Sequence, residues 1–191
     1  MENRYIVTRL LNNNIVQCFD TTLKRDCILL GNGIGFGKKK HDVIELENIE
    51  KSFVMEDQKN LTKYQQLVVS CDPEIVDVTE KIIVYLEEEF KTTYNEYLHI
   101  ALLDHLNFSV YRYRNNIEVP NIFLEELAMM YQKEYQFSET MLSYVNKTLG
   151  ITLPKSEISF ITMHIHAALK NKKVSKASLY AAIIKDCLEY I

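Results

Sequence analysis

The stretch Tyr5-Ile6-Val7-Thr8-Arg9-Leu10-Leu11-Asn12-Asn13-Asn14-Ile15-Val16-Gln17-Cys18-Phe19 decides the fold class of the first part of the chain. Its two outer segments, residues 5–11 and 15–19, are rich in the β-branched and aromatic residues that favour strands. The three asparagines between them indicate a turn, because their side chains can cap their own backbone and tolerate left-handed φ. We therefore expect two neighbouring antiparallel strands joined by this turn.

Two further strands are expected close by. One covers residues 26–30, and the other runs from Ile49 to Met55 and closes the sheet. A meander of about 55 residues has little core of its own, and dimerisation is an obvious way to stabilise it. The N-terminal part is therefore predicted to be a small four-stranded antiparallel β-sheet domain that forms a homodimer.

A glycine-rich stretch, Gly31-Asn32-Gly33-Ile34-Gly35-Phe36-Gly37-Lys38-Lys39-Lys40, lies between the last two predicted strands. It is neither a Walker loop, because Lys39 follows Gly37-Lys38, nor a dinucleotide fingerprint, because Phe36 stands where the third glycine is needed. Two interpretations stay open. Glycines that let backbone approach, an aromatic face and several lysines suit a nucleic-acid surface. A flexible hairpin loop with solvated lysines fits the composition equally well.

The charge is divided unevenly along the chain. Residues 1–41 carry seven basic and three acidic side chains, a net charge of +4, whereas residues 42–191 carry a net charge of −8. Such an asymmetry indicates a part that binds a polyanion joined to a part with another role. The overall net charge of −4 therefore does not exclude nucleic acid as a partner.

Composition places the chain in a general class. Its 191 residues are 47% hydrophobic and 25% charged, which is typical of a soluble globular protein with one or two small domains. No apolar run is long enough for a membrane span, and the N-terminus does not resemble a signal peptide. The four cysteines are scattered, so neither a disulfide framework nor a zinc site is predicted. We expect a cytoplasmic protein with reduced thiols, no membrane insertion and no metal or other cofactor.

Residues 60–149 contain no glycine, and apolar residues recur there with helical spacing. Asp72-Pro73 is a suitable helix start and Gly150 a suitable helix end. This part is predicted to be an all-α bundle of five or six helices. The helices are expected at residues 75–90, 98–110, 120–135 and 138–149, with a last one that ends near Lys170.

Four histidines fall on two of these helices, with sequence offsets of six and two that do not suit a metal site. At 100° per residue, His99 points into the leucine stripe and is expected to be structural. His105 lies at the edge of that stripe, and His164 lies at the rim of the buried face of the last helix. His166 is expected to turn further toward solvent.

Three motifs in the N-terminal part resemble one known domain. They are Leu11-Asn12-Asn13-Asn14-Ile15, the glycine stretch from Gly31 to Lys39, and Ile49-Glu50-Lys51-Ser52-Phe53. Their order and spacing are similar to those of the co-antiterminator RNA-binding domain of the BglG/SacY family of bacterial transcriptional antiterminators. In that family the domain dimerises and binds an RNA hairpin that overlaps a transcription terminator.

The resemblance implies which residues contact the RNA. Asn12, Asn14, Gly31 and Phe36 match family positions that touch RNA, and Arg9 and Lys38 are implied as phosphate partners. The family usually has Lys or Arg after the first glycine, whereas this chain has Asn32. Loss of that cation should flatten the salt dependence of binding, or Asn32 could contact a base edge instead.

The resemblance extends into the helical part. Two stretches are similar to the first phosphotransferase-system (PTS) regulation domain of the same antiterminators. They are residues 98–108, Leu98-His99-Ile100-Ala101-Leu102-Leu103-Asp104-His105-Leu106-Asn107-Phe108, and residues 157–168, Glu157-Ile158-Ser159-Phe160-Ile161-Thr162-Met163-His164-Ile165-His166-Ala167-Ala168. The resemblance implies that His105 and His164 are the phosphorylation sites. The phosphate donors it implies are PTS phosphoproteins, a sugar-specific IIB protein and the phosphocarrier HPr. The glycine loop and the His-Ile-His-Ala pattern resemble the glucose-responsive branch most.

These observations give a domain plan of β-sheet followed by α-bundle. We expect an RNA-binding domain at 1–56, a linker at 57–63 and the regulation domain at 64–172. Residues 173–191 are expected to be a linker and the first helix of a truncated second regulation domain, so the chain would be either a fragment of a longer protein or a naturally short protein. The function implied is an antiterminator controlled by histidine phosphorylation.

Two other classes of function make different demands on the sequence. A DNA-binding activator with the same sensor domain would need a helix-turn-helix at the N-terminus, where the pattern predicts strands. An enzyme built on the histidines would need a nucleophile or a ligand set with usable spacing, and the sequence offers neither. A non-enzymatic regulator is therefore preferred.

Overall fold

The computed structural model describes residues 4–117 and 123–170. The chain divides into two compact units, residues 1–77 and 78–191, and each unit is described by itself. The predicted helix within residues 173–191 lies outside the described residues, as does the start of the helix predicted from Pro120.

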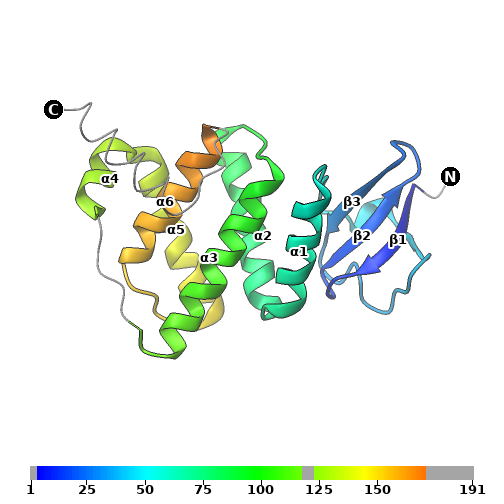
Figure 1. Ribbon diagram of the computed structural model, residues 1–191, viewed down its shortest axis with the longest axis horizontal. Helices are drawn as coiled ribbons and strands as arrows, with labels where there is room; N and C mark the ends of the chain where they lie inside the picture. The colour runs from blue at the N-terminus through cyan, green and yellow to red at the C-terminus, as the bar shows by residue number, and fades with distance from the viewer. Residues whose placement is uncertain (1–3, 118–122, 171–191) are drawn as a thin grey trace. The chain divides into compact units, whose positions relative to one another are not determined.

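The first unit is built on one antiparallel sheet with the strand order β4-β1-β2-β3-β5 (Figure 1). The four predicted strands are present, and a fifth, two-residue strand pairs with the start of β1. The predicted class, a small antiparallel sheet followed by helices, is confirmed. The strands are β1 Tyr5–Leu10, β2 Ile15–Asp20, β3 Arg25–Leu30, β4 Val43–Ile44 and β5 Lys51–Phe53.

Alternation along the strands builds the core of this sheet. Tyr5 and Val7 on β1 and Val16 and Cys18 on β2 turn to the same side, because side chains two apart in a strand share a face. The register slips between Val7 and Arg9, which marks a bulge in β1. The buried cluster consists of Tyr5, Val7, Val16, Cys18, Cys27, Leu29, Ile34 and Ile44.

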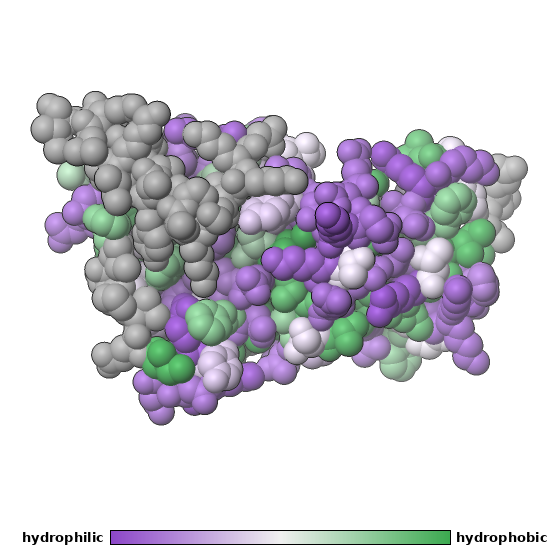
Figure 2. Space-filling view, in the orientation of Figure 1, coloured by the Kyte–Doolittle hydropathy of each residue, from purple (hydrophilic) through white to green (hydrophobic). Residues whose placement is uncertain are grey.

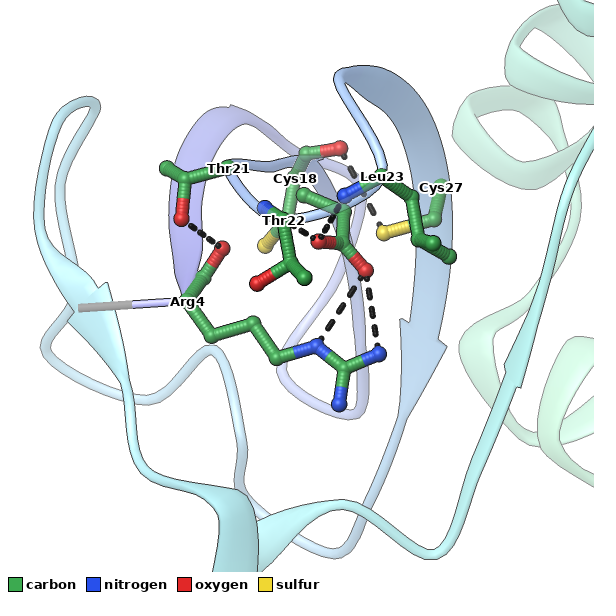
Figure 3. A network of polar contacts seen from close by, with 7 residues as sticks. Arg4, Cys18, Thr21, Thr22, Leu23 and Cys27 are labelled. Carbon is green, nitrogen blue, oxygen red and sulfur yellow. Dashed lines mark hydrogen bonds and ion pairs between the residues drawn. The ribbon is translucent and has the colours of Figure 1, made fainter. Parts of the chain in front are cut away.

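The turn between β2 and β3 is organised by the carboxylate of Asp20, and Figure 3 shows the residues that donate to it, Arg4, Thr22 and Leu23. Its Oδ1 accepts hydrogen bonds from the backbone N–H groups of Thr22 at 2.8 Å and Leu23 at 2.9 Å, and its Oδ2 accepts from Arg4 at 3.3 Å. Burial alone would raise the pKa of Asp20, but these backbone and guanidinium donors hold it below its usual range. The Asp20 carboxylate therefore anchors both the turn and the N-terminal Arg4.

Two cysteines face each other across β2 and β3. Cys18 and Cys27 are directly paired in the register, and the Cys27 thiol lies 3.5 Å from the Cys18 carbonyl oxygen (Figure 3). Burial raises the pKa of each thiol to about 12. Both are free thiols.

Two helices begin in the first unit. Helix α1 spans Gln58–Ser70 and starts at Asp57, whose side chain accepts a hydrogen bond from the Lys59 N–H. The helix is tied to the sheet unit by Tyr64, which is buried edge-on against Phe53 with the ring centroids 5.7 Å apart. Helix α2, Pro73–Phe90, opens with the predicted proline. Residues 5–53 form strands and one short 3-10 turn, so the DNA-binding alternative lacks its helix-turn-helix there.

The second unit is a helical bundle, as predicted. Helix α6 contacts α3, α4 and α5, and Figure 1 shows α3, α5 and α6 lying side by side. Helix α5 ends at Gly150, whose φ of +64° favours glycine. The helices are α3 Glu96–Arg114, α4 Leu124–Met130, α5 Gln132–Leu149 and α6 Ser156–Leu169.

The region of α4 and α5 differs from the prediction. One helix was expected to continue to Tyr135 and the next to begin at Ser138, but the break falls earlier, at Tyr131. Tyr131 has φ −127° and ψ 52°, outside the helical region, which separates α4 from α5. Its side chain is buried with Leu127 and Met163, so tertiary packing sets the position of the break.

The face of the described residues that Figure 2 shows is mostly polar. In Figure 2 hydrophilic residues dominate the visible face, and hydrophobic residues appear in small groups between them. Within residues 4–117 and 123–170, no helix is long and apolar enough to cross a membrane.

Candidate functional site

The asparagine turn and the glycine loop are joined by hydrogen bonds. Oδ1 of Asn14 accepts from the Gly33 N–H at 2.8 Å, and the Gly35 N–H donates to the Asn13 carbonyl at 2.9 Å. Oδ1 of Asn12 accepts from the Asn14 N–H at 2.8 Å, which closes the turn. The structure therefore brings these two sequence motifs together as one braced surface.

Gly31 and Gly35 are required by close backbone packing. A Cβ added at Gly31 would lie 2.0 Å from the carbonyl oxygen of Asn48, and one at Gly35 would lie 2.6 Å from that of Asn12. Both distances are far below van der Waals contact, so only glycine fits without a shift of backbone. Packing alone thus requires glycine at position 31, whether or not this residue contacts RNA.

Phe36 stands out on this surface because 78% of it is exposed. Its backbone N–H donates to the Gly33 carbonyl at 2.9 Å, so the residue is held in a turn while its ring lies in solvent. Asn32 is also exposed, and its N–H lies 3.3 Å from a Glu50 carboxylate oxygen. Lys38 is tied down, because its Nζ donates to the Val43 carbonyl at 3.0 Å.

The side chains of Arg9 and Asn14 donate hydrogen bonds to helix residues that no sequence motif predicts as part of the site. Nη1 of Arg9 donates to Gln65 at 2.8 Å, and Gln65 donates in turn to Gln17 at 2.6 Å. Nδ2 of Asn14 donates to Asp77 at 2.6 Å. These partners lie 56 and 63 positions away along the chain, and no local pattern marks them.

The second candidate site lies in the helical unit, where His105 of α3 meets His164 of α6. Their ring centroids are 5.2 Å apart, and the ring of Phe160 lies 5.4 Å from that of His105. His105 is buried and His164 is half-buried. The structure therefore brings the two histidines predicted from the sequence into one site.

A buried charge network supports His105. Its Nε2 lies 3.0 Å from Oε2 of Glu157, a residue that is only 1% exposed. The same carboxylate accepts from Ser109 at 2.7 Å and from Arg112 at 2.8 Å. Burial alone would raise the pKa of Glu157, but the donors of His105, Ser109 and Arg112 lower it to about 2. The network thus contains an ionised carboxylate at its centre.

The Glu157 network is not among the features that the sequence motifs predict. Ser109 and Arg112 follow His105 at offsets of four and seven, which places the three side chains on one face of α3. That polar stripe on an otherwise apolar face is the one signal that could have indicated a buried charge. Glu157 itself comes from a helix that begins more than 40 residues later.

The other two histidines also pair with glutamates. His99 is buried, with Nδ1 2.7 Å from a Glu80 oxygen, which confirms the expected structural position. His166 is half-buried, as His164 is, with 18% of its side chain exposed. Its ring stacks on Tyr131 with centroids 3.8 Å apart, its Nδ1 lies 3.0 Å from Glu134, and its Nε2 is buried. Aromatic stacking and an ion pair outweigh the solvation of this ring.

Metal binding has no support in the described ranges 4–117 and 123–170. No group of three or more His, Cys, Asp or Glu side chains there is placed to hold a metal ion. The histidine–glutamate pairs are hydrogen-bonded pairs instead.

Comparison with known proteins agrees with this division into sheet and bundle. Residues 5–62 match the family described as the CAT RNA binding domain, and residues 80–168 match the PRD domain. A sheet with a braced asparagine–glycine surface, followed by a bundle with paired histidines, therefore defines a two-domain regulator of the CAT–PRD class.

The curated relatives give the family. The chain is 33% identical over 191 residues to the PtsGHI operon antiterminator of Bacillus subtilis, covering 100% of this chain and 68% of that protein. It is 29% identical to the GlcA/glcB genes antiterminator of Staphylococcus carnosus, covering 97% and 65%. The chain belongs to the BglG/SacY family of transcriptional antiterminators, and it fits the glucose-responsive branch that the sequence resembles.

A solved structure supports the fold. The crystal structure of GlcT CAT-PRDI is similar with a TM-score of 0.79 and 35% identity, and the match covers 86% of this chain and 98% of that one. The chain spans about two thirds of the length of the curated relatives it matches. Family membership agrees with the prediction of a regulator rather than an enzyme.

Proposed function

We propose that the chain is the RNA-binding and phosphate-sensing part of a transcriptional antiterminator. It would hold an mRNA hairpin that overlaps a terminator and so prevent the terminator from forming. The observation that carries the proposal is the exposed Phe36 ring on a loop braced by Asn14. The proposed contact residues are Arg9, Asn12, Asn14, Gly31, Asn32, Phe36 and Lys38.

Exposure of the Phe36 ring supports RNA recognition by stacking. A large aromatic side chain left in solvent adds nothing to the core of its own unit, whereas a base offers it a π-face. The Oδ1 atoms of Asn12 and Asn14 accept hydrogen bonds from backbone N–H groups of the turn and the glycine loop, so this surface keeps one shape and would meet RNA without a further ordering cost. With a net charge of only +4 over residues 1–41, shape and stacking would outweigh bulk charge.

The proposed domain plan assigns residues 1–56 to RNA binding, 57–63 to the linker and 64–172 to regulation. Residues 173–191 would begin a second regulation domain. Two RNA-binding domains would act together as a homodimer, since one sheet of this size presents a small surface. The setting would be the cytoplasm, where both nascent mRNA and the phosphate donors are found.

Regulation would act through His105 and His164. A phosphoryl group adds a charge of about −1.5 to −2 at each site, and the helical part already carries an excess of acidic residues. Added charge near a self-complementary dimer interface would repel and shift the pair to an arrangement that does not bind RNA. The donors would be a sugar-specific IIB protein and HPr of the phosphotransferase system.

Replacement of Phe36 tests the RNA-binding surface. Phe36→Ala should weaken hairpin binding by roughly 5- to 150-fold, because stacking on an aromatic side chain contributes about 1–3 kcal/mol per base. The measurement is the affinity of the full chain for a panel of terminator-overlapping RNA hairpins. Leu23→Ala removes another exposed hydrophobic side chain, in the β2–β3 turn, and should leave binding unchanged. Equal binding by wild type and Phe36→Ala, or no preference for any hairpin, contradicts the proposal.

Replacement of Asn32 tests how RNA binding depends on salt concentration. Asn32→Lys restores the cation usual in the family and should steepen the slope of log affinity against log salt by roughly 0.7 to 0.9, the value for one added phosphate contact. Asn32 is exposed, so the change does not disturb the core. Hairpin titrations at four salt concentrations give the slope, with Leu23→Lys as a charge-matched control away from the loop. Parallel slopes for wild type and Asn32→Lys would place residue 32 outside the phosphate contacts.

A further inference from the structure

The histidine site defines which ring nitrogen of His105 is available for reaction. Nε2 of His105 lies 3.0 Å from Oε2 of Glu157, and an ionised carboxylate oxygen can only accept a hydrogen bond. The hydrogen of the neutral ring is therefore on Nε2, and the lone pair is on Nδ1. No residue in the described part of the chain hydrogen-bonds Nδ1 of His105.

Glu157 is itself fixed in place. Oε1 accepts from Nη2 of Arg112 at 2.8 Å, and Oε2 accepts from Ser109 at 2.7 Å. Arg112 also donates to Ser109 at 3.0 Å and lies over the ring of Phe108, with 4.7 Å between the guanidinium carbon and the ring centroid. Because Glu157, Ser109 and Arg112 each hydrogen-bond the other two, the Glu157 carboxylate has one orientation toward the His105 ring.

The His105 ring has little freedom to reverse. It packs against Phe160 and His164, with ring centroids 5.4 Å and 5.2 Å away, and its side chain is almost fully buried. A half-turn of the ring would place a carbon against the Glu157 carboxylate and forfeit a charge-assisted hydrogen bond. The buried pair thus selects one tautomer and one ring orientation.

We propose that His105 accepts its phosphoryl group on Nδ1, and that Glu157 is the positioning residue that selects this nitrogen. The inference rests on the proposed function, in which His105 is a phosphorylation site. The lone pair of Nδ1 forms the new bond to phosphorus, and the bond between phosphorus and the donor protein breaks, with its electron pair leaving on the donor. The Nε2 hydrogen stays in place, and the Glu157 carboxylate lies against the positive charge that the ring acquires.

The first measurement is the state of the unmodified ring. In ¹⁵N-histidine-labelled full chain, at a pH at which the ring is neutral, the nitrogen chemical shifts of His105 should show hydrogen on Nε2 and none on Nδ1. His105→Ala assigns the signal. Hydrogen on Nδ1 would overturn the inference before any phosphorylation experiment.

The second measurement is the phosphorylated nitrogen. The probe is HPr phosphorylated by enzyme I and phosphoenolpyruvate, with a phosphorylated glucose-specific IIB protein as a parallel donor. A His164→Ala background leaves one proposed acceptor, and the phosphorus–nitrogen coupling then identifies the nitrogen. Phosphate on Nδ1 supports the inference. Phosphate on Nε2 overturns it and leaves the proposed function standing, whereas no phosphate on His105 from either donor overturns the proposed function at this residue.

Glu157→Gln tests the positioning role. The amide keeps the shape but loses the charge, so the Nε2 tautomer should lose its preference in the nitrogen shifts, and the phosphorylation rate of His105 should fall roughly 10- to 100-fold. Glu134→Gln is the matched control, because it neutralises the partner of His166 in the same unit and should change neither readout. Unchanged tautomer and rate in a folded Glu157→Gln variant would overturn the role of Glu157.

Discussion

Glu157→Ala is expected to lower the free energy of unfolding of the helical unit by about 3–5 kcal/mol, the usual cost of removing one partner of a buried ion pair. The change leaves the Arg112 guanidinium buried without its carboxylate, and Ser109 and His105 lose an acceptor. It also creates a small cavity between α3 and α6. Urea denaturation followed by helical circular dichroism measures the loss.

Glu134→Ala provides the comparison for this result. Glu134 pairs with His166, but its side chain is more exposed than that of Glu157, at 15% against 2%, so its removal should cost about 1 kcal/mol. Equal losses for the two variants would contradict the assignment of Glu157 as the centre of a buried network.

The pH dependence of stability provides an independent check on the same network. The pKa of Glu157 is lowered from 4.5 to about 2 in the folded protein, so the unfolded state takes up a proton first as pH falls. The stabilisation is fully present above pH 4.5, is lost as pH falls toward 2, and amounts to about 3 kcal/mol. The difference in unfolding free energy between wild type and Glu157→Gln should therefore shrink between pH 5 and pH 2. A constant difference over that range would show that Glu157 does not titrate as the network requires.

Gly31→Ala is expected to destabilise the sheet unit by about 3 kcal/mol, at the upper end of the cost of overpacking. A methyl group there would lie 2.0 Å from the Asn48 carbonyl oxygen, and backbone has to move because no flexible side chain is available to give way. Amide hydrogen exchange of β3, whose end adjoins Gly31, measures the loss locally.

Gly37→Ala separates this effect from the general cost of replacing glycine in the loop. Gly37 has φ +69° with nothing near its would-be Cβ, so the substitution should cost only the strain of left-handed backbone, about 1 kcal/mol. If Gly31→Ala weakens RNA binding in proportion to its loss of stability, the glycine acts by shaping the loop. If the Gly31→Ala variant is as stable as the Gly37→Ala variant, the close approach of Gly31 to Asn48 does not constrain the fold.

Much of the fold was predictable because its signals are local. Alternating β-branched residues on either side of Asn12-Asn13-Asn14 indicate strands, and the glycine-free stretch that ends at Gly150 indicates helices. The two-residue β4 was missed, because a strand that short has no periodicity of its own. The break at Tyr131 was missed because no glycine or proline marks it.

The residues of the candidate sites were likewise predictable only in part. Asn14, Phe36, His105 and His164 were identified from motifs, and the structure gathers them into two places. Gln65, Asp77 and Glu157 were not identified, since a glutamine or a glutamate on a helix is ordinarily a solvated residue. His166 was assigned to solvent from helical geometry, which says nothing of the Tyr131 ring that covers it.

Local patterning alone set the order of the two parts, the strands around the asparagine turn and the helical nature of the bundle. These features depend on contacts within a few residues, where spacing along the chain determines spacing in space. Only packing decided that Glu157 faces His105 across 52 positions, that Asn48 leaves no room at Gly31, and that Nε2 of His166 is buried. A buried charge takes the partner that helix packing brings to it, and this packing is settled by the whole core.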